Sequence, residues 1–96
     1  MDWQAPPSNF SVVEFERVNP AKNEARFYYL AWQPAMLGEK VVVRMWGRKK
    51  SNSFRQLSMP FASLEEAWPT IRRLVKTRLR HGYHISAVSE PGDEQD

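Results

Sequence analysis

The chain has 96 residues, which suits one domain, and its 42% hydrophobic and 12% aromatic content excludes an intrinsically disordered chain. It contains no cysteine, which excludes disulfides, thiolate zinc sites and a cysteine nucleophile. The net charge of +3 is unevenly spread: residues 40–84 hold 11 Lys and Arg against Glu65 and Glu66, whereas the flanks are acidic. A basic body is typical of a polyanion-binding protein or of a solubilising surface.

Both ends of the chain differ in composition from its centre. Residues 1–9 are polar and proline-rich and predict a disordered lead-in that includes Trp3, and residues 86–96 are small and acidic and predict a disordered tail. The start of the chain lacks the basic and apolar regions of a signal peptide, and no apolar run approaches the roughly 20 residues that cross a bilayer. We therefore expect one ordered domain over residues 10–85 in a cytoplasmic protein.

Four segments have the β-branched and aromatic composition of strands, and they span about 10–18, 25–33, 40–48 and 54–59. Turn-forming residues separate them at 19–23, 34–39 and 49–53. Because these connections are short, neighbouring strands are expected to pair antiparallel.

After the strands, the hydrophobic period changes to three and four residues, which predicts a helix over about 64–81. Ser63 and Glu66 match a capping box at its start, and Gly82 lies where a left-handed C-terminal cap belongs. Pro69 predicts a kink or a separate first turn. The side chains expected to face the sheet are Leu64, Ala67, Trp68, Ile71, Leu74, Val75 and Leu79. The predicted fold class is α+β, an antiparallel sheet of about four strands with one long C-terminal helix packed on one face.

The opposite face of the predicted helix is basic. It carries Arg72, Arg73, Lys76 and Arg80, with Arg78 at its edge. Arg72, Lys76 and Arg80 are spaced four residues apart and form one stripe along the helix without an acidic partner. Repulsion between these like charges lowers the stability of the helix. The stripe is therefore either a solvated helix face or part of a polyanion-binding surface.

The third predicted strand places two different sets of side chains on its two faces. Val41, Val43 and Met45 form an apolar set, which we expect to be core under the helix. The other set is Val42, Arg44, Trp46 and Arg48. A tryptophan between two arginines can stack on a base or ribose while the guanidiniums pair with phosphates, or it can be a core residue with an arginine on its ring. Gly47 permits a bulge or the close approach of another backbone or a ligand.

The chain shows no pattern of an enzyme. His81 and His84 have no third ligand nearby, and the sequence lacks the glycine-rich phosphate-binding loops and the serine-hydrolase motif. The carboxylates of Glu65 and Glu66 are explained by the start of the helix. We expect no catalytic residue, no metal and no cofactor.

Met45-Trp46-Gly47-Arg48 at the end of the third strand resembles the motif that names the WGR domain family. The resemblance covers roughly residues 10–84 and extends to the Asn19-Pro20 turn, Arg26-Phe27-Tyr28, the loop 33–38, the segment 61–67 and the segment 78–83. The chain is similar to the small stand-alone bacterial members. It departs from the family at Lys49-Lys50-Ser51-Asn52-Ser53, where glycines are usual, so contacts made by that loop are not carried over.

The resemblance implies a compact antiparallel sheet with a helix packed on it. The domain also occurs in poly(ADP-ribose) polymerases, where it contacts DNA near a break and touches neighbouring domains. There the motif's tryptophan packs on the terminal nucleotide and its arginine contacts the backbone, roles that would fall on Trp46 and Arg48.

Together, the residues and the resemblance predict a non-enzymatic, low-specificity nucleic-acid binder, with DNA as the expected ligand. Its expected binding residues are Arg44, Trp46, Gly47, Arg48, Lys49, Lys50, Arg72, Lys76 and Arg80. The alternative is a protein-interaction module that acts with a partner protein and without nucleic acid. The chain is expected to be a monomer or a weak dimer, because exposed strand edges can pair.

Overall fold

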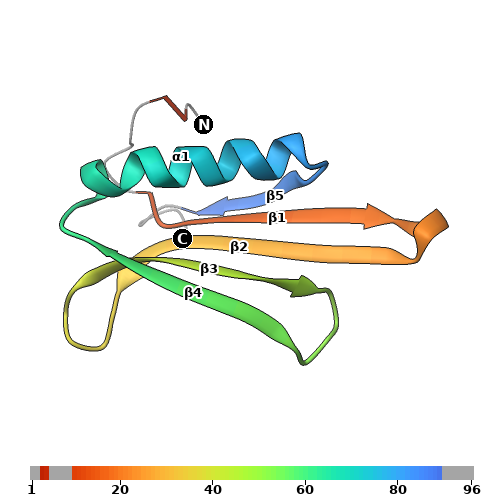
Figure 1. The fold of residues 1–96 in the computed structure, drawn as a ribbon, viewed down its shortest axis with the longest axis horizontal. Coiled ribbons are helices and arrows are strands. Elements are labelled where there is room, and N and C mark those ends of the chain that lie inside the picture. The colour runs from red at the N-terminus through yellow and green to blue at the C-terminus, as the bar shows by residue number, and fades with distance from the viewer. Residues whose placement is uncertain (1–2, 5–9, 90–96) are drawn as a thin grey trace, which may run out of the picture.

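A computed structural model describes residues 3–4 and 10–89 of the chain, and its strands form one antiparallel sheet with the order β4-β3-β2-β1-β5 (Figure 1). The strands are β1 (Val12–Asn19), β2 (Glu24–Pro34), β3 (Lys40–Arg48), β4 (Phe54–Phe61) and β5 (His84–Ser89). A short 3-10 turn, η1 (Pro20–Lys22), joins β1 to β2, and one helix, α1 (Leu64–Arg80), lies between β4 and β5 in the chain. The predicted α+β class is confirmed, and the first four strands lie close to their predicted positions.

The fifth strand corrects the sequence prediction, which gave about four strands. β5 pairs antiparallel with β1 at the edge of the sheet, with Ile85 opposite Phe15. Residues 86–89, which were predicted to belong to the disordered tail, are therefore part of the sheet. The remainder of the predicted tail, residues 90–96, lies outside the described residues.

The two ends of α1 are held as the sequence predicts. At the start, the hydroxyl of Ser63 accepts a hydrogen bond from the backbone N–H of Glu66 at 3.1 Å. At the end, Gly82 has a φ of +88°, its N–H donates to the Leu79 carbonyl, and the Tyr83 N–H donates to the Arg78 carbonyl. This pair of bonds is a Schellman motif, which favours glycine at the left-handed position. The helix is continuous through Pro69.

The rotation of the last turns of α1 differs from the prediction. Arg78, expected at the edge of the basic face, turns toward the sheet and lies over the rings of Tyr28 and Tyr83. Leu79, expected to face the sheet, is 43% exposed.

The face of β3 that lies on the helix side is the one that carries Val42, and not the predicted face with Val41, Val43 and Met45. Val42 belongs to the core cluster under α1, together with Tyr28 and Leu30 of β2. Val41 and Val43 are also buried, but on the other face of the sheet, where they line a groove with residues of the 34–39 loop. The prediction that Val41, Val43 and Met45 form the core under the helix is therefore wrong. The rest of the core comes from β1, the helix and the residues beside them: Phe10, Val13, Phe15, Ala67, Trp68, Ile71, Leu74, Val75 and Tyr83.

Trp3, placed by the sequence in a lead-in without structure, packs on this core. Its ring stacks on that of Trp68 with centroids 5.7 Å apart, and its carbonyl accepts a hydrogen bond from the Trp68 indole at 3.0 Å. Trp68 is a core residue, as predicted, and Trp32 is half-buried against the core. The other lead-in residues, apart from Gln4, lie outside the described residues.

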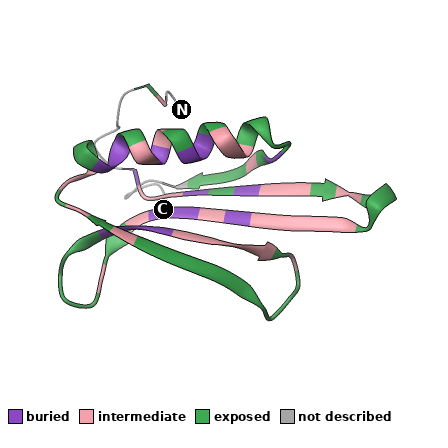
Figure 2. Cartoon of the chain, viewed as in Figure 1, coloured by how far each residue is buried: buried purple, intermediate pink, exposed green. Residues whose placement is uncertain are grey.

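The helix covers only part of the sheet. Figure 1 shows α1 running along β5 and β1, while β3 and β4 lie on the far side of β2. Figure 2 shows purple residues in α1, β1, β2 and the first half of β3, whereas β4 is green over most of its length. Beyond Val42, Met59 and Phe61, which belong to the core or pack against it, the helix-side face of β3 and β4 toward the 49–53 hairpin is therefore available for contacts with other molecules.

Candidate nucleic-acid interface

The motif residues of β3 lie on this uncovered area, beside side chains of β4. Trp46 pairs across the strands with Arg55, and Arg44 pairs with Leu57. Directly paired residues of antiparallel strands share a face. Arg55 was not among the predicted binding residues, because its proximity to Trp46 follows from the register of a hairpin and from no pattern of its own.

A pocket of about 400 Å³ opens at the hairpin end of the two strands. Its walls carry the side chains of Arg48 and Arg55, the Trp46 ring and, from β2, Arg26. The lining also includes Gly47, Ser51, Ser53 and Phe54 and contains no carboxylate. A second pocket of about 350 Å³ adjoins it and shares Trp46 and Arg55, with Gln56 and Leu57. The two pockets together form a basic groove with an aromatic wall.

Gly47 leaves room for the close approach of β4. A Cβ at this position would lie 3.2 Å from the Ser53 carbonyl oxygen and 3.3 Å from two atoms of Phe54. The pairing of β3 with β2 and β4 runs without a register shift here, so the glycine serves a close backbone approach rather than a bulge. The glycine of the motif therefore allows β4, with Phe54 and Arg55, to lie close beside Trp46.

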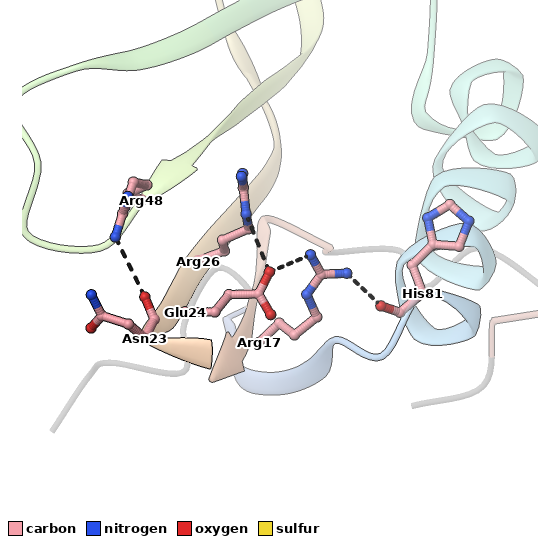
Figure 3. Close-up of polar contacts among 6 residues, drawn as sticks. All are labelled: Arg17, Asn23, Glu24, Arg26, Arg48 and His81. Atoms are coloured by element: carbon pink, nitrogen blue, oxygen red, sulfur yellow. Dashed lines mark hydrogen bonds and ion pairs between the residues drawn. The ribbon is translucent and has the colours of Figure 1, made fainter. Parts of the chain in front are cut away.

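The arginines around the pocket differ in their electrostatic partners (Figure 3). Glu24 is shared by Arg17 at 2.9 Å and by Arg26 at 3.6 Å, so part of the charge of Arg26 is compensated. Arg48 contacts only the backbone carbonyl of Asn23, at 3.5 Å, among the residues that the structure describes. Arg55 has no carboxylate partner within the described ranges. Arg48 and Arg55 are therefore the pocket cations that form no ion pair within the described ranges, although Glu24 lines an adjoining pocket together with Arg48.

Trp46 both packs against the core and lines an open surface. It is half-buried, packs against the core cluster and stacks beside Tyr28 with ring centroids 6.1 Å apart. It also lines both pockets, and the guanidinium of Arg44 lies 5.1 Å from its ring centroid. The ring is thus anchored by the core and presented at the edge of an open surface.

The other predicted binding residues are dispersed. Lys49 forms an ion pair with Glu16 at 3.0 Å, and Lys50 is exposed in the hairpin turn with a φ of +65°. Arg72 donates a hydrogen bond to the Gln4 carbonyl at 3.1 Å. Lys76 and Arg80 are exposed on the side of α1 that faces away from the sheet. The structure therefore groups Arg44, Trp46, Gly47 and Arg48, and separates the helix stripe from them.

Residues 3–4 and 10–89 contain neither a metal-ligand cluster nor a helix that could span a membrane. No group of three His, Asp or Glu side chains in these ranges could hold a metal ion. The one described helix, α1, is too short and too polar to cross a membrane.

Comparison with known protein families gives one match, to the WGR domain, over residues 11–90. No curated protein and no solved structure matches the chain. The matched range includes all five strands, the helix and the Trp46-Gly47-Arg48 motif, and WGR domains are in general a nucleic-acid-binding type of module. The chain belongs to the WGR domain family.

Proposed function

We propose that this chain is a non-enzymatic module that binds nucleic acid, with DNA as the expected ligand, through the groove of β3 and β4. The observation that carries the proposal is the pocket at the hairpin end, where Arg48 and Arg55 flank the Trp46 ring without a carboxylate in the lining. Guanidinium groups bind phosphate oxygens in a bidentate manner, and an aromatic ring stacks on a base or ribose of any sequence. Binding should therefore depend on the backbone and show little sequence preference.

The proposal is tested by fluorescence anisotropy with labelled DNA and RNA oligonucleotides that are blunt, nicked or single-stranded, at low and at physiological salt. Affinity should fall steeply with salt, because phosphate contacts release counterions. Trp46→Ala should weaken binding by about 1–3 kcal/mol, the usual contribution of base–aromatic stacking. Arg48→Gln should reduce the slope of the logarithm of affinity against the logarithm of salt concentration by about 1.

A matched control is Arg73→Gln, which removes the same charge from the exposed outer face of α1. It should bind nearly as the unmodified protein does. Equal losses in Arg48→Gln and Arg73→Gln would mean that the positive charge acts without a specific site. Binding that is unaffected by Trp46→Ala combined with Arg48→Gln would refute the proposed interface. Because the module is proposed to be non-enzymatic, the oligonucleotides should be recovered intact after incubation.

A second candidate function is the binding of a partner protein. The observation in its favour is the apolar tip of the 34–39 loop, where Met36 is 101% and Leu37 is 91% exposed. The loop borders a groove of about 710 Å³ on the sheet face opposite the helix. Exposed apolar side chains of this kind often mark a protein contact. In that case a partner would be retained after nuclease treatment, lost in Met36→Ser combined with Leu37→Ser, and retained in Trp46→Ala.

A further inference from the structure

Tyr28 of β2 holds two arginines that come from different elements. The ring is 1% exposed and lies between β1 and β3 in the sheet. Its hydroxyl accepts a hydrogen bond from Nε of Arg44 at 2.7 Å, and the guanidinium of Arg78 lies 4.6 Å from its ring centroid. The sheet and the helix thus each bring one positive charge to the same aromatic side chain.

Neither charge is compensated by a carboxylate among the described residues, where the ion pairs involve other cations. Arg44 contacts Tyr28 and the Trp46 ring, and Arg78 contacts the rings of Tyr28 and Tyr83. In addition, Nε of Arg78 is buried without a hydrogen-bond partner; Nε of Arg17 is too, but the guanidinium of Arg17 is paired with Glu24. Stacking on a ring attracts a cation, but it does not neutralise its charge or occupy all its N–H groups.

The position of Arg78 is unusual for a residue with a purely structural role. It lies seven residues after Ile71 and four after Leu74, on the helix face that is otherwise buried and apolar. An uncompensated, half-buried guanidinium is generally less favourable there than an apolar side chain of similar length. Its presence is explained if an anion completes the site.

We propose that Arg44 and Arg78 bind a second phosphate group of the nucleic acid, beside the Trp46 pocket, and that Tyr28 is the positioning residue that holds Arg44 for this contact. On the helix-side face of β3, Arg44 and Arg48 lie on either side of Trp46, so the two phosphate contacts flank the aromatic ring. The inference rests on the proposed function and adds Arg78 and Tyr28 to the interface.

The first test is Arg78→Met, with Arg73→Met on the outer face of α1 as the matched control. A binding role predicts that Arg78→Met weakens oligonucleotide binding several-fold and lowers the salt slope by about 1, while its melting temperature stays equal or rises. Arg73→Met should bind with unchanged affinity and slope. An Arg78→Met protein that binds as tightly as the unmodified protein, or that melts at a lower temperature and has an unchanged salt slope, would overturn the inference.

The second test is Tyr28→Phe, which removes the hydroxyl and keeps the ring. Its control is Tyr83→Phe, since Tyr83 lies in the same cluster but its hydroxyl does not bind Arg44. In Tyr28→Phe, the NMR signal of the Arg44 Nε–H should shift and exchange faster with water, and oligonucleotide affinity should fall several-fold. In Tyr83→Phe, neither should change. An unchanged Arg44 signal and unchanged affinity in Tyr28→Phe would refute the positioning role.

The same measurements separate this inference from the proposed function. If Trp46→Ala and Arg48→Gln lose binding but Arg78→Met and Tyr28→Phe do not, the interface stands and the second phosphate contact is refuted. If the unmodified protein binds no oligonucleotide at physiological salt, the proposed function and this inference are both refuted.

Discussion

Arginine side chains near the end of α1 are held in two different ways. Arg17 donates to the Glu24 carboxylate at 2.9 Å and to the His81 carbonyl at 2.8 Å, and thereby links β1 to the end of the helix. Its guanidinium also lies 5.0 Å from the centroid of the Tyr83 ring. Arg44 and Arg78 are held by aromatic rings and a hydroxyl, without a carboxylate among the described residues. A carboxylate cancels the charge that it holds in place, whereas a ring leaves it available. Under the proposed interface, arginines thus stabilise the fold in one case and attract a ligand in the other.

Tyr29, on the sheet face away from the helix, provides a prediction about pH. Burial raises the pKa of Tyr29 above its ordinary value of 10.0, and the nearby negative charge of Glu14 raises it further. Glu14→Gln should therefore lower the pKa of Tyr29, as measured by NMR titration of the tyrosine ring carbons. Glu39→Gln, in the distant loop, should leave it unchanged, and an identical effect of both variants would contradict this origin of the shift.

The sign of the linked stability effect follows from the direction of that shift. Because the folded pKa is raised, the folded state retains the phenol proton more strongly than the unfolded state. The contribution of Tyr29 to stability is complete below the unfolded pKa and is lost as the pH rises through the folded pKa. Glu14→Gln should reduce this loss at alkaline pH.

Single residues of the proposed interface were predictable from the sequence where they belong to the family motif. Trp46 and Arg48 were identified from the strand pattern and the resemblance, and both line the pocket. Arg55 and Arg78 were not, because neither belongs to a motif. The first depends on the β3–β4 register, and the second on the rotation of the helix about its axis. The strand register and the helix rotation are both set by tertiary packing, which the spacing of residues in the sequence does not determine.

At the scale of elements, the N-terminal cap of α1 can be tested directly. Ser63→Ala removes the acceptor for the Glu66 N–H and should lower the free energy of unfolding by about 0.5–2 kcal/mol, measured by urea denaturation. Ser63→Asp should retain most of the stability, because a carboxylate also accepts this bond and favours the positive end of the helix. Equal free energies of unfolding for Ser63→Ala and Ser63→Asp would mean that this capping hydrogen bond does not stabilise the protein.

The elements also show which sequence patterns were ambiguous. The run Val41-Val42-Val43 is buried on both faces of the sheet, so hydrophobicity could not tell which face lies under the helix. The strand face with Met45 was predicted to lie under the helix because the other face carries Arg44. In the structure, Arg44 lies on the helix side, where it contacts the Tyr28 hydroxyl and the Trp46 ring. β5 was missed because its short sequence is rich in small residues and its partner, β1, lies about 70 residues earlier in the chain. Such pairing is not visible in local patterns.

At the scale of the whole molecule, β5 should be essential although it lies at an edge. It pairs with β1, and Ile85 packs against the core cluster. A chain that ends after Tyr83 should lose about 2–5 kcal/mol of stability, comparable to the loss of a large core side chain, and should self-associate through the uncovered edge of β1. Denaturation and sedimentation velocity measure the two effects. A chain that ends after Ser89 retains β5 and should match the full chain in both, and equal behaviour of the two truncations would show that β5 is dispensable.

The residues that stabilise the fold and the exposed residues of β4 lie in different parts of the molecule. None of the eight residues of β4 is buried, while the core is formed mainly by α1, β1 and β2. Substitutions on the outward side chains of β4, such as Phe54, Arg55 and Leu57, therefore cost little folding energy. This hairpin can accumulate sequence change and alter what the domain binds without a loss of foldability, which makes β4 the natural place for ligand preference to diverge among proteins with this architecture and for selection experiments to begin.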